Sequence, residues 1–284
     1  REYHLNQPVY LQLLYYVEDA FTFNFGISPA FKQPVSSLIL TYYPRTLVLD
    51  FLAIALTIVL GVFSGAFSAA HQDKPRDYTV RVIYLVSWGA PPFLVALILQ
   101  FVFSYHWGIF PSNQMADPSL GVPHTITGII SLDALLTGDY SFFMSWVEHA
   151  ILPVIALALI SFGIVTRIMR SSMLTTLRMD YIRTARMKGI GDFKAVYRHA
   201  LKNSLIPVIT IISLVFAYLI AGSIIIEQIF GYEGMGYLIT QSVYLFDYPT
   251  LIGSTIVVTI SVVIINFIAD LTYALVDPRI RLGQ

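Results

Sequence analysis

Few ionisable side chains in this 284-residue sequence are spaced in a way that suits catalysis or metal binding. The sequence contains no cysteine, which excludes disulfides, thiolate metal sites and cysteine nucleophiles. No HExxH pair, GxSxG segment or Ser/Lys arrangement is present. We therefore expect no metal site and no catalytic residue. The six histidines are typical of loop or interfacial residues: His4, His71, His106, His124, His149 and His199.

One polar pair interrupts an apolar run near the C-terminus. Asn266 and Asp270 are four residues apart and would share one face of a helix. A charge inside a membrane helix is costly, so Asp270 should be functional or paired. As an ion-coupling pair, these residues would indicate a secondary transporter. Alternatively, Asp270 lies near the end of its helix and contacts water or a loop.

The glycine-rich stretch 231–236 (GYEGMG) invites comparison with phosphate-binding loops. It lacks both the GxGxxG spacing and a Walker lysine, and it follows an apolar run rather than a strand. Nucleotide binding here is therefore excluded. A tight re-entrant turn and an ordinary surface turn both remain possible, because glycine clusters mark turns in general.

Basic residues are concentrated in residues 167–204, which contain nine Lys and Arg residues. Within this stretch, residues 180–188 begin with a carboxylate and end with Lys188 before Gly189, as a short helix would. A second short helix would follow the glycines at 189 and 191. The stretch could serve only to orient the chain in a membrane, or it could bind a protein partner. It lacks the context of a nucleic-acid-binding motif.

The elements that carry these residues are membrane helices. Hydrophobic residues make up 56% of the sequence and charged residues 12%, against about 25% charged in soluble domains. A spanning helix needs about 20 apolar residues, and the runs here lack the alternation of a membrane strand. Pro91 and Pro92 should bend the second helix and free backbone carbonyls. We expect an all-α polytopic membrane protein with helices at about 46–70, 82–103, 150–166, 205–226 and 251–276.

The distribution of charge predicts the orientation of these helices. Of the 17 Lys and Arg residues, 14 lie on the side that contains residues 167–204, and that side is expected to be cytoplasmic. Counting carboxylates, the net charge is +9 on this side and −8 on the other, with Asp270 inside a helix. Residues 1–45 are then an outer segment and the C-terminus is cytoplasmic. Because the sequence begins with Arg1 on the outer side, we expect a further helix before it.

Residues 180–207 (DYIRTARMKGIGDFKAVYRHALKNSLIP) resemble a known family. They are similar to the EAA loop of permease subunits of bacterial and archaeal ATP-binding-cassette (ABC) importers, specifically the oligopeptide/dipeptide/nickel branch. Arg183, Thr184 and Ala185 replace the Glu-Ala-Ala of the general pattern, which fits this branch and disfavours a maltose-type permease. The resemblance implies a coupling helix that docks on an ATPase, formed by Tyr181, Arg183, Thr184, Ala185, Arg186, Lys188 and Gly189.

Other segments resemble the same branch, including residues 5–28, 149–153, 247–249 and 273–279. Residues 227–236 match its E-x-x-F-x-x-x-G-x-G motif. The resemblance makes five residues of that motif candidates for an outer gate or the translocation pathway: Glu227, Phe230, Gly231, Gly234 and Gly236.

The resemblance implies a first-position permease with the transmembrane domain of a type I ABC importer, here residues 46–284, and six helices in all. Its partners would be a second permease in a heterodimer, two cytoplasmic ATPase subunits that hold ATP and Mg²⁺, an external solute-binding protein and the lipid bilayer, with no nucleic acid. The chain itself would bind no cofactor and would not be an enzyme.

The resemblance also implies a location and a cargo. The chain would lie in the inner or plasma membrane of a bacterium or archaeon and import di- or oligopeptides, with oligosaccharides or nickel as alternatives. An ion-coupled secondary transporter that uses Asp270 and a structural membrane scaffold are the rival interpretations.

Overall fold

The computed structural model describes residues 7–276, except for some side chains in α1, in α10 and at the end of α12. These residues form helices and no strand, apart from an isolated bridge between Ile27 and Pro34. In chain order the α-helices are α1 (Val9–Phe21), α2 (Val35–Ala70), α3 (Pro75–Gly89), α4 (Pro92–Leu99), α5 (Ile130–Leu136), α6 (Tyr140–Leu177), α7 (Asp180–Met187), α8 (Asp192–Lys194), α9 (Leu201–Ser204), α10 (Ile206–Phe230), α11 (Met235–Tyr244) and α12 (Tyr248–Val276).

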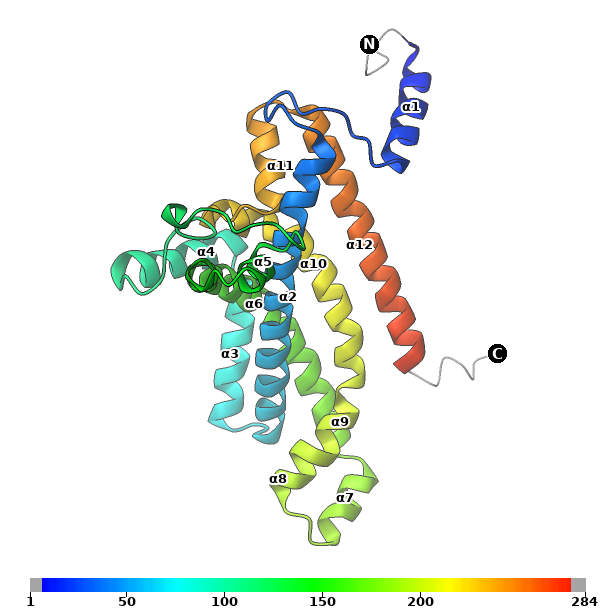
Figure 1. The fold of residues 1–284 in the computed structure, drawn as a ribbon. Helices are drawn as coiled ribbons and strands as arrows, with labels where there is room; N and C mark the ends of the chain where they lie inside the picture. Colours follow the sequence, from blue (N-terminus) through cyan, green and yellow to red (C-terminus); the bar gives the residue numbers. More distant parts are fainter. Residues whose placement is uncertain (1–6, 277–284) are drawn as a thin grey trace.

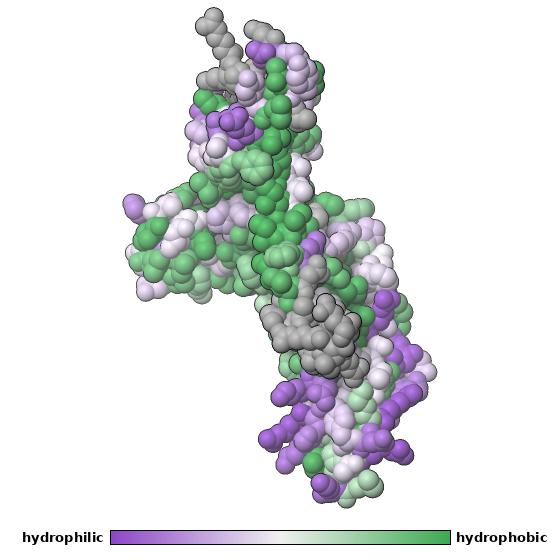
Figure 2. All heavy atoms as spheres, turned by 90° about the vertical axis from the view of Figure 1, so that its right-hand side faces the viewer, coloured by the Kyte–Doolittle hydropathy of each residue, from purple (hydrophilic) through white to green (hydrophobic). Residues whose placement is uncertain are grey.

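Long apolar helices run along the molecule, with α7 and α8 at one end and α1 at the other (Figure 1). By length and composition, α2, α6 and residues Tyr248–Ile268 of α12 could each cross a membrane. Two bent pairs of helices raise the number of spans to five if each pair is one span. On the face shown in Figure 2, hydrophobic side chains cover the middle of the molecule and hydrophilic ones gather around α7 and α8. This surface fits a bilayer around the middle, with α7 and α8 in water.

Residues 82–103, expected as one span with a bend, form parts of two helices that meet at 108°. Helix α3 ends at Gly89, and Ala90 donates its N–H to the carbonyl of Val86. Pro91 follows with extended ψ of 133° and has no N–H to donate. The preceding residue is also forced out of the helical region. The two prolines therefore end one helix and begin another, and the chain turns a corner.

Helices α2 and α6 are longer than the apolar runs that predict them. Helix α2 begins at Val35 rather than at residue 46, and accommodates Pro44 in its interior. Helix α6 continues past Thr166 to Leu177, so the expected loop 167–204 is helical over its first eleven residues. Hydropathy marks only the part of a helix that faces lipid, and it misses the turns that continue into water.

Two glycines one turn apart allow α2 and α6 to approach closely. A Cβ atom built on Gly61 would lie 2.5 Å from Val165 Cγ1. One built on Gly65 would lie 2.7 Å from both Met169 Cβ and the carbonyl oxygen of Thr166. This GxxxG spacing lets membrane helices pack backbone against side chain. The close contact therefore holds α2 against α6, and the C-terminal end of α6 leads into α7.

Candidate functional site

Helix α7 is fixed to the protein on one face and open on the other. Ile182 is completely buried and belongs to the main apolar cluster, together with Met173 of α6 and Val196. Its neighbours Tyr181 and Arg183 are exposed. The helix is thus anchored by one apolar side chain and leaves its polar side exposed.

Gly189 ends α7 in a left-handed conformation, with φ of +82°. Its N–H donates to the carbonyl of Arg186 at 2.9 Å, and that of Ile190 donates to Ala185 at 3.2 Å. These two bonds form a Schellman motif, in which glycine avoids the steric cost of a Cβ atom. A Cβ atom built on Gly189 would meet nothing within 4 Å. The requirement for glycine is therefore the backbone conformation and not a close approach.

Hydrogen bonds connect α7 to the segment that follows it. The Asn203 side-chain amide donates to the Tyr181 hydroxyl at 2.7 Å, which joins α7 to α9. Arg186 Nε lies 3.0 Å from a carboxylate oxygen of Asp192, the first residue of α8. Arg183 lies 3.8 Å from Asp180. Because these charge pairs are exposed, they contribute little to stability and can exchange partners.

Apolar side chains lie exposed beside these charges. Met187, the last residue of α7, is 81% exposed, and Phe193 of α8 is 76% exposed. Exposed aromatic and methionine side chains beside cationic groups are typical of protein-binding surfaces. The end of the molecule that carries α7 therefore has the composition of a docking site.

Glu227 lies in the last turn of α10, far from α7, and is completely buried. Thr46 donates its hydroxyl to Glu227 Oε1 at 2.6 Å. The N–H groups of Gly236 and Tyr237 donate to Glu227 Oε2 at 2.7 and 3.1 Å. Since these N–H groups belong to the first turn of α11, Glu227 satisfies donors that a helix end leaves without partners.

The glycines after Glu227 permit this arrangement. Gly231 ends α10 in the left-handed conformation with φ of +55°. A Cβ atom on Gly234 would lie 2.6 Å from Glu227 Cδ, and one on Gly236 would lie 2.4 Å from Ile224 Cα. The turn is therefore packed tightly around the carboxylate. An ordinary surface turn, one of the two expectations for residues 231–236, does not describe it.

Aromatic residues and Arg45 connect the same turn to α6 and α2. Phe230 and Tyr232 are both buried, and Trp146 of α6 donates its indole N–H to the Tyr232 hydroxyl at 3.2 Å. Arg45 of α2 donates to the carbonyl and the carboxylate of Glu233, at 3.1 and 2.9 Å. The five motif residues of 227–236 thus come together in one compact turn that bonds to both α2 and α6.

Of the predicted polar pair in α12, Asn266 and Asp270, the structure describes only the side chain of Asn266. Asn266 is half-buried, and its side-chain oxygen has no hydrogen-bond partner among the described residues. The side chain of Asp270 lies outside the described residues, as do Arg279 and Arg281. The role of the pair stays a prediction.

The sequence analysis assigned no role to Asp77 and Asp50, two carboxylates that the structure buries completely. Asp77 is completely buried and bonded to Arg170 and Arg81, although all three had been counted only as loop charges. Asp50 belongs to the expected helix at 46–70, and the charge count places it among the outer carboxylates. It lies inside α2, completely buried, and neither of its oxygens bonds to another described residue. The spacing of Asp77 and Arg81 at i and i+4 was a usable signal. Asp50 also gave a signal, because it is a charged residue within the expected membrane helix at 46–70.

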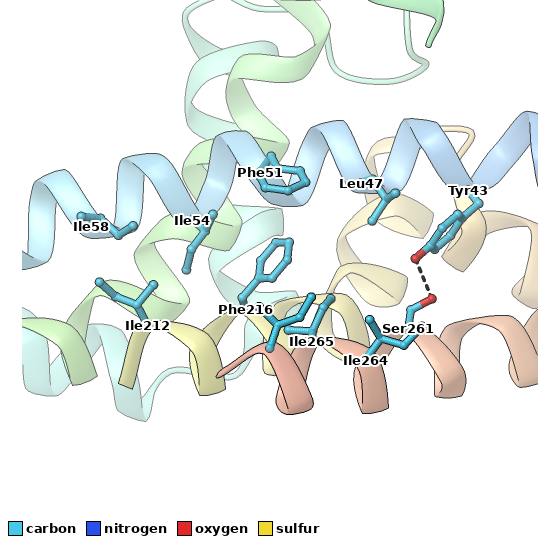
Figure 3. A pocket seen from close by; sticks show the side chains of 11 residues that line it. Tyr43, Leu47, Phe51, Ile54, Ile58, Ile212, Phe216, Ser261, Ile264 and Ile265 are labelled. Atoms are coloured by element: carbon cyan, nitrogen blue, oxygen red, sulfur yellow. Dashed lines mark hydrogen bonds between the residues drawn. The ribbon is translucent and has the colours of Figure 1, made fainter. Parts of the chain in front are cut away.

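An apolar pocket of about 490 Å³ lies between α2, α10 and α12 (Figure 3). The rings of Phe51 and Phe216 are in contact, tilted by 47° with their centroids 5.1 Å apart. The Tyr43 hydroxyl donates to Ser261 at 2.6 Å near one end. The other lining residues are aliphatic, so the pocket suits apolar groups and offers no charge to bind a substrate terminus.

Comparisons with known proteins agree with these features. Residues 57–282 match the family described as "Binding-protein-dependent transport system inner membrane component". The chain is 37% identical over 279 residues to the probable D,D-dipeptide transport system permease protein of Escherichia coli strain K12, covering 98% of this chain and 82% of that protein. It is 37% identical over 277 residues to the dipeptide transport system permease protein of Alkalihalophilus pseudofirmus, covering 98% and 83%.

Solved structures with a similar fold come from two transporters. A chain of the inward-facing MetNI methionine ABC transporter superposes with a TM-score of 0.64 at 14% identity, covering 84% of this chain and 96% of that one. A chain of an amino acid ABC transporter crystallised with histidines gives a TM-score of 0.58 at 16% identity, covering 84% and 94%. At these identities the likeness concerns the fold alone.

Proposed function

This chain belongs to the family of binding-protein-dependent transport system inner membrane components, and from that premise we propose that it imports dipeptides or oligopeptides. It is a multi-pass permease subunit of an ABC importer, with the fold of such transmembrane chains. The resemblance drawn from residues 180–207 is confirmed. The observation that carries the proposed substrate is the similarity to peptide permeases over 98% of the chain.

The proposed coupling site is Tyr181–Gly189, which comprises most of α7 and the turn that ends it. Arg183, Arg186 and Lys188 would pair with carboxylates of an ATPase subunit, which holds ATP and Mg²⁺ and performs hydrolysis. Two features support this role. Helix α7 packs on residues 195–200, which contact α6 and α9, and the bond between Asn203 and Tyr181 joins α7 to α9 directly. Movement of the ATPase would therefore displace membrane helices instead of bending a loose loop.

The proposed assembly places a second permease beside this chain in a heterodimer, with two ATPase subunits and an external solute-binding protein. The excess of Lys and Arg in residues 167–204 supports a cytoplasmic position for α7 and for the C-terminus. The turn at 227–236 would then lie on the outer side and act as a gate. Its bonds to α2 through Thr46 and Arg45 support that role, because they would carry helix movement to the turn.

Transport by the reconstituted importer tests this proposal. The chain, its partner permease and the ATPase subunits are placed in proteoliposomes, with the binding protein and a labelled dipeptide or tetrapeptide outside. We expect uptake that requires ATP and is unaffected when ion gradients are collapsed. Uptake driven by an ion gradient without ATP would instead support the secondary transporter that uses Asp270, and absence of any uptake would support a scaffold. Competition by unlabelled oligosaccharides or nickel, but not by peptides, would contradict the proposed substrate.

A further inference from the structure

A buried charge cluster joins α2, α3 and α6 at the ends of these helices nearest α7. Asp77, in the first turn of α3, has a completely buried side chain. Arg170 of α6 donates to both of its oxygens, from Nε at 2.8 Å and from Nη2 at 2.7 Å. Arg81 adds a bond from Nη2 at 2.7 Å. One carboxylate is therefore shared by two guanidinium groups on different helices.

The same carboxylate also holds the end of α2 and the turn that follows it. Ser68, in the last turn of α2, donates its hydroxyl to Asp77 Oδ1, and the backbone N–H of Asp73 donates to Oδ2 at 3.0 Å. The side chain of Arg170 is only 15% exposed, so water screens this pair weakly. A bidentate, shielded pair of this kind fixes geometry as well as contributing energy.

The cluster is connected to α7 by continuous structure. Helix α6 runs without interruption from Arg170 to Leu177, which is about 10 Å along its axis. Met173 on this stretch is completely buried, and the Ser204 hydroxyl lies 3.3 Å from its sulfur. Helix α7, with its buried Ile182, packs on residues 195–200, and these residues contact α6 and α9. A displacement of α7 therefore reaches the end of α6 through packed side chains.

We propose that Asp77 and Arg170 are positioning residues for transport, which make the turn between α2 and α3 move as one body with α6 and α7. The inference rests on the proposed role of α7 as the coupling helix. Movement imposed on α7 then reaches the α2–α3 turn itself, and not only the part of α2 that packs on α6 through Gly61 and Gly65. Among the residues that the structure describes, the cluster is the only polar link between the α2–α3 turn and α6. Its loss would loosen this turn, while Gly61 and Gly65 still hold the middle of α2 against α6.

Variants of the cluster test this inference in the complete importer in proteoliposomes. Asp77→Asn removes the charge, and Arg170→Lys keeps the charge but cannot form two parallel bonds. We expect peptide uptake per ATP hydrolysed to fall about three- to thirtyfold in either variant, while ATP hydrolysis continues. The matched control is Arg76→Lys, because Arg76 lies on α3 one residue from Asp77, is exposed, and contacts His71 instead of the cluster. Normal uptake per ATP in both cluster variants would overturn the inference.

A distance measurement tests the inference in the unaltered cluster. Because the chain contains no cysteine, Gln72→Cys and Arg178→Cys place two spin labels at exposed positions, beside the α2–α3 turn and beside α7. We expect the distance between the labels to be the same in the nucleotide-free and ATP-bound complexes, and to differ between these states when Asp77→Asn is added. A distance that already changes with the cluster intact would overturn the inference even if a variant fails to assemble. ATP-independent uptake by the unaltered complex would contradict the proposed function instead.

Discussion

Gly189 and Gly191 lie in the same loop, yet only Gly189 has a positive φ. Gly189→Ala forces a Cβ atom into the left-handed region at a cost of about 1 kcal/mol, whereas Gly191→Ala is compatible with its φ of −61°. We expect Gly189→Ala to lower peptide uptake per ATP several-fold, because the end of α7 loosens. Gly191→Ala serves as the control and should behave like the unaltered importer. Equal effects of the two substitutions would show that the backbone conformation is not the requirement.

Glu227 accepts three hydrogen bonds in a completely buried position. Glu227→Ala leaves two backbone N–H groups and a hydroxyl without that acceptor, at a cost of about 1–3 kcal/mol for each group left unsatisfied. We expect a clearly lower thermal unfolding temperature for this variant of the purified importer in detergent. Glu227→Gln retains an acceptor and should be intermediate. A Glu227→Ala variant as stable as the original would contradict the proposed bonding around α11.

Interactions between residues could be predicted from the sequence only where the interacting residues are close along the chain. The end of α7 was predictable because Lys188 and Gly189 form a local signal. The partners of Glu227 were not predictable, because Thr46 is 181 residues away. Arg170 and Asp77 are 93 residues apart, and only the fold brings them together.

At the scale of elements, the packing of α2 on α6 depends on Gly65. A larger side chain there meets Met169 and the Thr166 carbonyl and overpacks the interface, which typically costs about 1–3 kcal/mol. We expect Gly65→Leu to lower the yield and the thermal stability of the assembled importer. Gly222→Ala on α10 is the control, because a Cβ atom there meets nothing within 4 Å. Stability of Gly65→Leu equal to that of the control would exclude this close contact.

Hydropathy predicted the existence of the long helices better than their ends. The apolar run at 150–166 identified α6 but not its end. The helix continues to Leu177, and this last part carries Arg167 and Arg170, so hydropathy does not detect it. The GxxxG spacing of Gly61 and Gly65 was present in the sequence and would have indicated a helix interface. By contrast, the two prolines at 91 and 92 predicted a bend but not its angle of 108°.

At the scale of the whole molecule, the proposed orientation can be measured by labelling. The chain has no cysteine, so a single introduced cysteine reports on one position. We expect a membrane-impermeant maleimide to label His124→Cys in intact spheroplasts, and Gln72→Cys only after the membrane is permeabilised. Both positions are exposed in the structure. The reverse pattern would invert the proposed topology and place α7 outside, where no ATPase could reach it.

The corner between α3 and α4 also has a consequence for the surrounding lipid. Helix α3 has 15 residues and rises about 22 Å, which is less than the ~30 Å of a typical hydrocarbon core. We expect the bilayer to thin beside this corner, and the elastic cost of thinning grows with acyl chain length. We expect uptake in vesicles of short-chain phospholipids to exceed uptake in long-chain ones at equal fluidity. On this basis the importer would respond to the thickness of its membrane as well as to its substrate.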